Sequence, residues 1–220
     1  MGYGMLIWWA SGVFQPEWNQ IYEPTDERGG TTTVVWCHGG GSQPESLAVL
    51  APYFSDCRFI LPTGPIASVN GGYDWVRLLD STELTVDGDL LMQHVQEFRH
   101  WLHELKLVSQ GAVVLGGLSQ GAIFAGVVAL NVPSLIDGLF VLSGFVPRPA
   151  ASVSLQGLRV FVAHGDADPL IRPQLAADTA NLFLSLGAAV DRHFYSMGHD
   201  LNDQELADLT AWISRFRQPA

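Results

Sequence analysis

Two hydrophobic patterns alternate along the chain. Between residues 89 and 107, apolar residues recur three or four positions apart, which predicts an amphipathic helix. Elsewhere, short apolar runs rich in β-branched residues end at glycines or polar residues, which indicates buried strands. The predicted strands span residues 32–37, 58–61, 112–115, 139–142, 158–163 and 190–195. The predicted helices span residues 45–54, 89–107, 120–130, 174–186 and 204–216.

Strands that read as continuous apolar runs, separated by helices, predict a mostly parallel sheet with helices on both faces, an α/β fold. The apolar start, residues 1–12, is predicted to be a first strand, and residues 62–84 are predicted to form a loop. Neither a repeat nor a linker divides the sequence, so we expect a single domain over residues 1–220.

Composition and net charge argue against several classes of function. Apolar residues make up 48% of the chain and charged residues 15%, as expected of a folded globular protein. The net charge of −11 argues against nucleic-acid binding and against adsorption to anionic membranes. The start of the chain lacks a basic region, and each apolar run is too short to span a bilayer. We therefore expect a cytoplasmic protein without stable membrane insertion, and the sequence leaves a homodimer open.

Four polar clusters each follow a predicted strand. They are His38-Gly39-Gly40-Gly41, the serine of Gly117-Leu118-Ser119-Gln120-Gly121, His164-Gly165-Asp166-Ala167-Asp168, and His199-Asp200. Ligands of open parallel sheets bind beyond the carboxyl ends of the strands. The four clusters are therefore expected to share one edge of the sheet, and to form the functional site there.

Ser119 has two local interpretations. It could be the N-cap of the helix that follows, with the glycines easing a tight turn. Alternatively, it stands on a nucleophile elbow, a strained strand-to-helix turn that exposes a serine hydroxyl. A serine nucleophile needs an imidazole as base and a carboxylate that orients the imidazole. The chain order Ser119, Asp168, His199 matches the order of the α/β-hydrolase arrangement and favours the elbow.

The glycines after residue 37 would complete such a site. Without side chains, backbone N–H groups can approach the oxyanion of a tetrahedral intermediate. The expected donors are the N–H groups of Gly40 and of Gln120, the residue after the serine. His38 and His164 are interpreted as structural residues that hydrogen-bond nearby backbone. Cys37 and Cys57 match no metal motif, and His94, His100 and His103 are expected on a solvated helix face, so neither a metal nor an organic cofactor is expected.

In these motifs the chain resembles the phospholipase/carboxylesterase family of small α/β-hydrolases, which includes acyl-protein thioesterases. The resemblance extends from about residue 34 to the C-terminus. It rests on the segments HGGG at His38, GGYDW at Gly71, GGLSQGA at Gly116, LSGFVP at Leu142, HGDADPLI at His164 and MGHDL at Met197. HGGG also marks the hormone-sensitive-lipase-like esterases, but those carry a helical cap ahead of the motif, and only 37 residues precede His38 here.

The resemblance implies an α/β-hydrolase fold without a separate cap domain. It implies Ser119 as nucleophile, His199 as base and Asp168 as orienting acid, with Gly40 and Gln120 forming the oxyanion hole. The expected activity is hydrolysis of small-molecule carboxylic esters or thioesters, with short to medium acyl chains, through an acyl-enzyme. The alternatives are a same-fold lactonase, peptidase or lysophospholipase, or a non-catalytic binding module of the same fold.

Two choices within the site remain open at this stage. Asp166 and Asp168 both follow the strand 158–163, and we expect Asp168 to be the acid because Pro169 extends the backbone there. Asp166 is expected to close the turn after Gly165. Trp75 and Phe145 both follow loops on the predicted edge, so each could line a substrate pocket or pack in the core.

Overall fold

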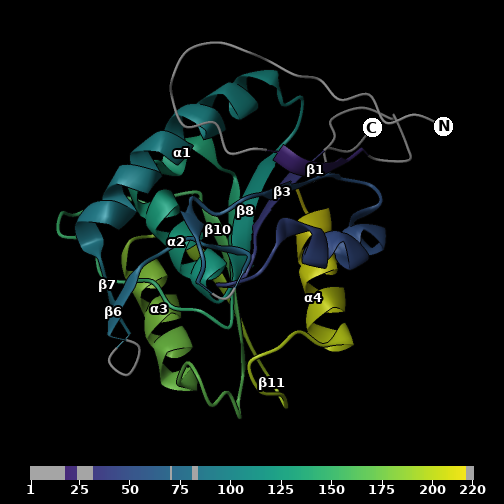
Figure 1. Ribbon diagram of the computed structural model, residues 1–220. Helices are drawn as coiled ribbons and strands as arrows, with labels where there is room; N and C mark the ends of the chain where they lie inside the picture. Colours follow the sequence, from purple (N-terminus) through teal and green to yellow (C-terminus); the bar gives the residue numbers. More distant parts are fainter. Residues whose placement is uncertain (1–17, 24–31, 70, 81–83, 217–220) are drawn as a thin grey trace.

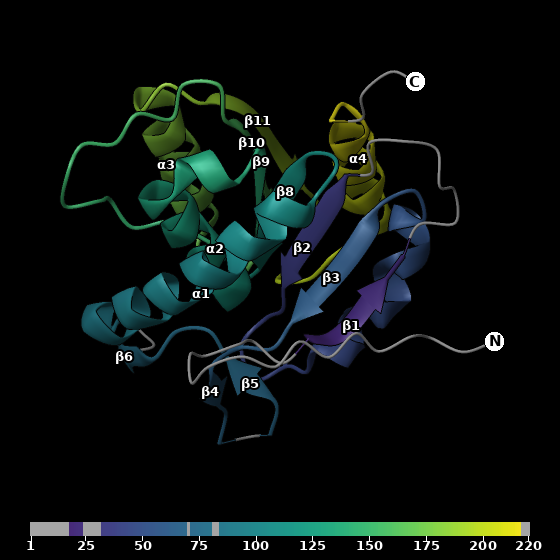
Figure 2. The ribbon, with the colours of Figure 1, turned by 90° about the horizontal axis from the view of Figure 1, so that it is seen from above.

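The central feature of the fold is a twisted sheet. A computed structural model of the chain describes residues 18–23, 32–69, 71–80 and 84–216. Within these residues the sheet has seven strands in the order β1-β3-β2-β8-β9-β10-β11. Figure 2 shows β1, β3, β2 and β8 side by side at one end of this order.

Six of the seven strands are parallel and follow the predicted apolar runs. They are β2 (Thr33–Cys37), β3 (Arg58–Pro62), β8 (Val113–Leu118), β9 (Gly138–Leu142), β10 (Arg159–Gly165) and β11 (Ala189–Tyr195). The seventh, β1 (Trp18–Tyr22), pairs antiparallel with β3 at the edge. The hydrophobic pattern did not predict β1, and the strand predicted over residues 1–12 lies outside the described residues.

Helices cover both faces of the sheet, as predicted (Figure 1). One face carries α1 (Gly88–Val108), α2 (Gln120–Asn131) and α3 (Pro173–Ser185). The opposite face carries α4 (Asp203–Ser214) and the 3₁₀ segment η1 (Pro44–Phe54). A shorter 3₁₀ turn, η2 (Pro133–Leu135), follows α2. The mostly parallel α/β sheet expected from the sequence is thereby confirmed.

The side chains on the two faces of the sheet pack into two separate hydrophobic cores. In β2, Val35 packs toward α1 and α2, whereas Val34 and Trp36 pack toward η1 and α4. This alternation follows from the period of two along a strand. Helix α2 lies in the middle of the first core, and its residues 121–130 are all buried, which explains why its sequence has no polar face.

Residues 62–84 contain more structure than the predicted loop. Two short hairpins occur here, β4 (Ile66–Ala67) with β5 (Tyr73–Asp74), and β6 (Leu78–Asp80) with β7 (Thr85–Val86). A bridge between Ser42 and Tyr73 joins the first hairpin to the glycine turn after β2. Figure 2 shows this hairpin beyond the carboxyl ends of β2 and β3, so it lies beside the edge where the polar clusters gather.

Candidate active site

Ser119 lies between the end of β8 and the start of α2 in a strained backbone conformation. Its φ is 57° and its ψ is −121°, whereas an L-residue rarely adopts positive φ. Its N–H donates to Leu142 O and its carbonyl accepts from Ile123 N–H. Its hydroxyl makes no capping hydrogen bond to the helix. Ser119 therefore occupies the N-cap position of α2 without capping it through its side chain, and the strained strand-to-helix turn favours the elbow interpretation.

Two glycines allow this turn to pack tightly against β2. A Cβ atom at Gly117 would lie 2.4 Å from Cys37 O, and one at Gly121 would lie 2.1 Å from the same oxygen. Both distances are too short for real contacts, so a side chain at either position would displace backbone. The glycines before and after Ser119 therefore let the elbow lie directly against the end of β2.

The carboxylate of Asp168 accepts a hydrogen bond from His199. The distance from His199 Nδ1 to Asp168 Oδ2 is 2.7 Å. The other carboxylate oxygen, Oδ1, accepts from the N–H groups of Leu170 and Ile171 at 2.8 and 2.9 Å. Burial acts to raise the pKa of Asp168, but hydrogen bonds from Ile171, His199 and Leu170 outweigh it and hold the pKa below its ordinary value. Asp168 is thus an ionised acceptor at neutral pH.

The neighbouring aspartate has a different environment. The carboxylate of Asp166 accepts from Ser196 Oγ at 3.3 Å, and its backbone N–H donates to Tyr195 O. These bonds join the turn after β10 to the end of β11. Of the two aspartates of the motif, the structure places Asp168 against His199 and Asp166 on the turn.

His164 contacts the acid, which the sequence analysis missed. Its Nε2 lies 3.1 Å from Asp168 Oδ2 and 2.8 Å from Ile171 O. The interpretation of His164 as a residue that bonds only backbone is therefore incomplete. The four-residue spacing between His164 and Asp168 at the end of a strand was the available signal, but the direction of both side chains depends on the turn between them.

The glycine turn after β2 lies against the elbow. A Cβ atom at Gly39 would lie 3.9 Å from Ser119 Cβ, and one at Gly40 would lie 2.3 Å from Gln120 Nε2. Among the described residues, neither the Gly40 N–H nor the Gln120 N–H donates a hydrogen bond to protein. Both donors are available beside Ser119, as the sequence analysis expects of an oxyanion hole.

Side chains brace this turn from two directions. Gln120 Oε1 accepts from the backbone N–H groups of Trp75 and Val76 at 3.1 and 3.4 Å. His38 Nε2 accepts from Gly64 N–H at 3.1 Å, and burial lowers the pKa of His38, which keeps the ring neutral. His38 therefore has the structural role expected from the sequence, since it joins the turn to the segment after β3.

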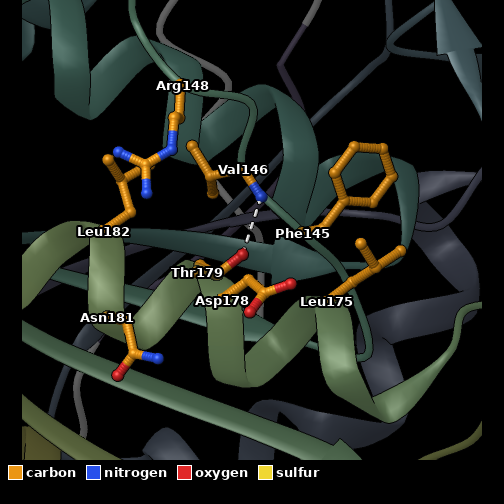
Figure 3. A pocket seen from close by; sticks show the side chains of 8 residues that line it. All are labelled: Phe145, Val146, Arg148, Leu175, Asp178, Thr179, Asn181 and Leu182. Carbon is orange, nitrogen blue, oxygen red and sulfur yellow. Dashed lines mark hydrogen bonds between the residues drawn. The ribbon is translucent and has the colours of Figure 1, made fainter.

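The two aromatic residues considered for substrate contact lie in different environments. Trp75 is fully buried and packs on Phe124, Phe98 and His38, so it belongs to the core and not to a pocket wall. Phe145 is half-buried and lines a cavity of about 390 Å³ between the loop after β9 and helix α3. Figure 3 shows Phe145 and Leu175 at one end of this cavity and Arg148 and Leu182 at the other.

The loop after β9 joins the elbow to the residues that line this cavity. Gly144 precedes Phe145, and a Cβ atom at Gly144 would lie 3.1 Å from Ser119 O. The backbone N–H of Val146 donates to Thr179 Oγ1 at 2.9 Å, which fixes the loop on α3 (Figure 3). Phe145, at the apolar end of the cavity, therefore directly follows the residue that packs against the elbow.

Within the described residues, no group of three or more His, Cys, Asp or Glu side chains is placed to hold a metal ion. His94 is buried on α1, so the helix face expected to be solvated is partly covered. None of the described helices is long and apolar enough to cross a membrane.

Comparison with known proteins shows the same pattern over most of the chain. A model of the Phospholipase/Carboxylesterase family matches residues 18–216. Lysophospholipase-like protein 1 of Mus musculus is 32% identical, over 88% of this chain and 89% of that protein. Acyl-protein thioesterase 1 of Kluyveromyces lactis is 27% identical, over 83% of this chain and 90% of that protein. Among solved structures, the Bacillus cereus carboxylesterase superposes with a TM-score of 0.79 at 21% identity, over 89% of this chain and 92% of that one.

Proposed function

The chain belongs to the phospholipase/carboxylesterase family and has its α/β-hydrolase fold, and from this premise we propose that it hydrolyses carboxylic esters or thioesters through an acyl-enzyme on Ser119. The observation that carries the proposal is the 2.7 Å hydrogen bond between His199 and Asp168. It occurs at the same edge of the sheet as the strained turn that exposes Ser119.

The hydrogen bond to Asp168 sets the protonation of His199. Because Asp168 Oδ2 only accepts, His199 Nδ1 carries the proton and Nε2 keeps its lone pair. That lone pair is the base which removes the proton of Ser119 Oγ as the oxygen attacks the carbonyl carbon. The carboxylate stabilises the imidazolium that forms, and its low pKa keeps it ionised at neutral pH.

The remaining steps follow from the same groups. As the C–O bond to Ser119 forms, the carbonyl oxygen becomes an oxyanion that the N–H groups of Gly40 and Gln120 stabilise. The intermediate collapses, the alcohol or thiol leaves with the proton from His199, and the acyl group remains on Ser119. A water molecule, deprotonated by His199, then attacks the acyl-enzyme and releases the carboxylic acid.

The cavity beside Phe145 supports a preference for short acyl chains. Its volume of about 390 Å³ is near the lower end of the range for small-molecule pockets. We infer that the chain of the acyl group enters between Phe145 and Leu175, and that chains of about two to eight carbons fit best. The leaving group faces away from this cavity, which leaves both oxyesters and thioesters as substrates.

Kinetics of two single variants and their double variant test the proposed mechanism. Ser119→Ala and His199→Ala should each lower kcat on butyryl oxyesters and thioesters by about 10⁴-fold or more. The double variant should lose little beyond either single one, because the two residues act as a unit. Ser196→Ala removes an exposed serine near His199 and is the matched control, expected to stay within about threefold of the parent.

Three outcomes would contradict the mechanism. Additive losses in the double variant would mean that Ser119 and His199 act separately. Substantial activity in Ser119→Ala would mean that another group is the nucleophile. Lack of activity in the folded parent protein on all esters, thioesters and lactones tested would favour a binding module of the same fold.

A further inference from the structure

His164 occupies a position that the proposed mechanism does not use. It is the penultimate residue of β10, and its side chain is fully buried. Its Nε2 faces two acceptors, Ile171 O at 2.8 Å and Asp168 Oδ2 at 3.1 Å. Since neither acceptor carries a proton at neutral pH, Nε2 is the protonated nitrogen. Its N–H donates to Ile171 O, and Asp168 Oδ2 lies beside the same nitrogen as a second, more distant acceptor.

The His164 ring reaches the acid as a neutral dipole. Burial lowers the pKa of His164, against the opposing effects of the Ile171 carbonyl and the Asp168 charge. His164 therefore presents Asp168 with an N–H dipole at 3.1 Å but not with a second positive charge. Its other nitrogen, Nδ1, is buried without a hydrogen-bond partner among the described residues, so the ring is held through Nε2 alone.

Each oxygen of the Asp168 carboxylate has a separate set of donors. Oδ1 accepts only from the backbone of its own loop, at Leu170 and Ile171. Oδ2 accepts a hydrogen bond from His199 on the loop after β11, and it lies 3.1 Å from Nε2 of His164 at the end of β10. His164 also binds the carbonyl of Ile171, so one N–H joins the rigid strand both to the carboxylate and to the loop that carries it.

We propose that His164 is a positioning residue of this site, which shares Asp168 Oδ2 with His199 and holds the carboxylate in the plane of the His199 ring. The proposal rests on the proposed function, because it assigns His164 a role only if Asp168 orients a catalytic base. His164 has no contact with the reacting atoms, and it acts through Asp168.

Sharing the oxygen has an electrostatic consequence. The His164 N–H withdraws part of the negative charge of Oδ2 from His199. Without it, the carboxylate stabilises the His199 imidazolium more strongly and is held less rigidly. Loss of His164 should therefore move the acid limb of the kcat/KM profile to higher pH and lower kcat.

Few other charged groups lie near His164, Asp168 and His199. Asp166 accepts from Ser196, and Asp200 accepts from the backbone N–H of Leu201, so both have other partners. Glu205 on α4 lies close enough to Asp200 for the two carboxyl groups to interact. None of the three loses a hydrogen bond when His164 is replaced, so a change in the acid limb reports on Asp168 and His199.

Two substitutions at position 164 separate a positioning role from a structural one. His164→Leu keeps comparable volume but removes the donor. His164→Gln restores an N–H₂ group at the distance of Nε2, which can donate to both acceptors. His94→Leu, at a buried histidine of α1 that makes no contact with Asp168 or His199 within the described residues, is the matched control for loss of a buried imidazole.

The measurements are kcat, KM and the pH dependence of kcat/KM on a butyryl ester, together with the downfield proton NMR signal of the His199 Nδ1–H. His164→Leu should lower kcat by about 10- to 100-fold with little change in KM, raise the midpoint of the acid limb, and shift the NMR signal. His164→Gln should restore most of the kcat and the parental midpoint, and His94→Leu should retain both.

Some results would overturn the role of His164. Parental kcat and an unchanged acid limb in folded His164→Leu would do so. Equal losses in the Leu and Gln variants with an unmoved acid limb would show a structural role only. If His164→Leu does not fold, a Gln variant with a clearly lowered kcat and a parental NMR signal would also contradict it. The NMR signal is read in the resting protein, so it tests the hydrogen bonds even if the parent proves inactive on esters.

Discussion

Several hydrogen bonds of the candidate site are accepted by the carboxylate of Asp168. It accepts hydrogen bonds from two backbone N–H groups and from His199, and it lies 3.1 Å from Nε2 of His164, while only 7% of its surface is exposed. A buried carboxylate with this many donors is held in one orientation. Asp168 therefore fixes both the tautomer and the ring orientation of His199, the proposed base.

The two aspartates of the motif provide a matched pair of variants. Asp168→Asn should keep the shape of the side chain but favour the wrong tautomer of His199, and lower kcat by up to about 10⁴-fold. Asp166→Asn should lower kcat by about tenfold or less, because its carboxylate bonds only Ser196. Ester hydrolysis by the two purified variants measures both effects, and a larger kcat loss from Asp166→Asn would contradict the assignment of the acid.

Some residues of the site could be proposed from sequence and others could not. Ser119, Asp168 and His199 each follow an apolar run, and their chain order is informative without any structure. The contact of His164 with Asp168 could not be predicted, because it depends on how the turn after β10 folds back. The burial of Trp75 could not be predicted either, since a residue after a hairpin can face either the core or the cavity.

At the scale of elements, the elbow depends on close contact between three backbone segments. β8 ends, α2 begins and β2 ends within van der Waals distance of one another, with Gly117 and Gly121 against Cys37 O. Helix α2 has small residues on the side that meets the loop after β9, and a Cβ atom at Gly126 would lie 2.2 Å from a methyl group of Val146. The elbow is therefore positioned by packing on two sides.

A pair of glycine substitutions tests this dependence. In Gly121→Ala the new methyl group would overlap Cys37 O, so the free energy of unfolding should fall by about 1–3 kcal/mol or more and activity should fall with it. Gly88→Ala places its methyl group in open space at the start of α1 and should be neutral or slightly stabilising. Urea unfolding of both variants makes the comparison, and equal stability of the two would contradict the packing argument.

Helix α4 contains a buried acid that has no hydrogen-bond partner among the described residues. Glu205 is the third residue of α4, and both of its carboxyl oxygens are buried without a partner. Burial, with a smaller effect of Asp200, raises the pKa of Glu205 to about 8. The group is therefore protonated in the folded protein at neutral pH, whereas in the unfolded chain it is ionised.

This difference predicts how stability depends on pH. Between its unfolded pKa of 4.5 and its folded pKa of about 8, the folded state binds the extra proton, so the free energy of unfolding should decrease as pH rises. Glu205→Gln should remove this decrease, which amounts to a few kcal/mol over the interval. Glu104→Gln, at an exposed glutamate of α1, should leave the slope as in the parent. Urea unfolding from pH 5 to pH 8 compares the slopes, and equal slopes in the parent and Glu205→Gln would contradict the assignment.

The elements that the sequence predicted best are those with the longest periodic patterns. α1 and the buried parallel strands match their predictions closely, because burial on one or both sides imposes the pattern. The hairpins within residues 62–84 have strands of two or three residues, too short for any period to show. The segment η1, which the sequence predicts to be a helix, has 3₁₀ geometry, and it contains Pro52, whose missing N–H removes one helical hydrogen bond.

At the scale of the whole molecule, the parallel order of β2, β8, β10 and β11 brings distant segments to one edge. Each strand ends at this edge, and each contributes one of the four polar clusters. The hairpin of β4 and β5 and the loop after β9 surround it (Figures 1 and 2). In the proposed function, the size of the cavity beside Phe145 determines which acyl chains fit.

The cavity predicts the dependence on acyl chain length. kcat/KM should be higher for butyryl and hexanoyl esters than for palmitoyl esters. Leu175→Ala enlarges the cavity and should lower kcat/KM for short-chain esters by about tenfold. The difference in kcat/KM between short-chain and palmitoyl esters should become smaller in this variant. Leu184→Ala, on the exposed side of the same helix, is the control and should change neither quantity. A preference for palmitoyl over butyryl esters in the parent would contradict the assignment of the cavity.

The central claim is that Ser119 is an activated nucleophile, and labelling with a fluorophosphonate probe tests it most directly. The folded protein should take up one probe per chain, and peptide mapping should place the label on Ser119. Ser119→Ala should remain unlabelled, and His199→Ala should react far more slowly because the base is missing. A folded protein that takes up no probe, or that carries the label on another serine, would contradict the account.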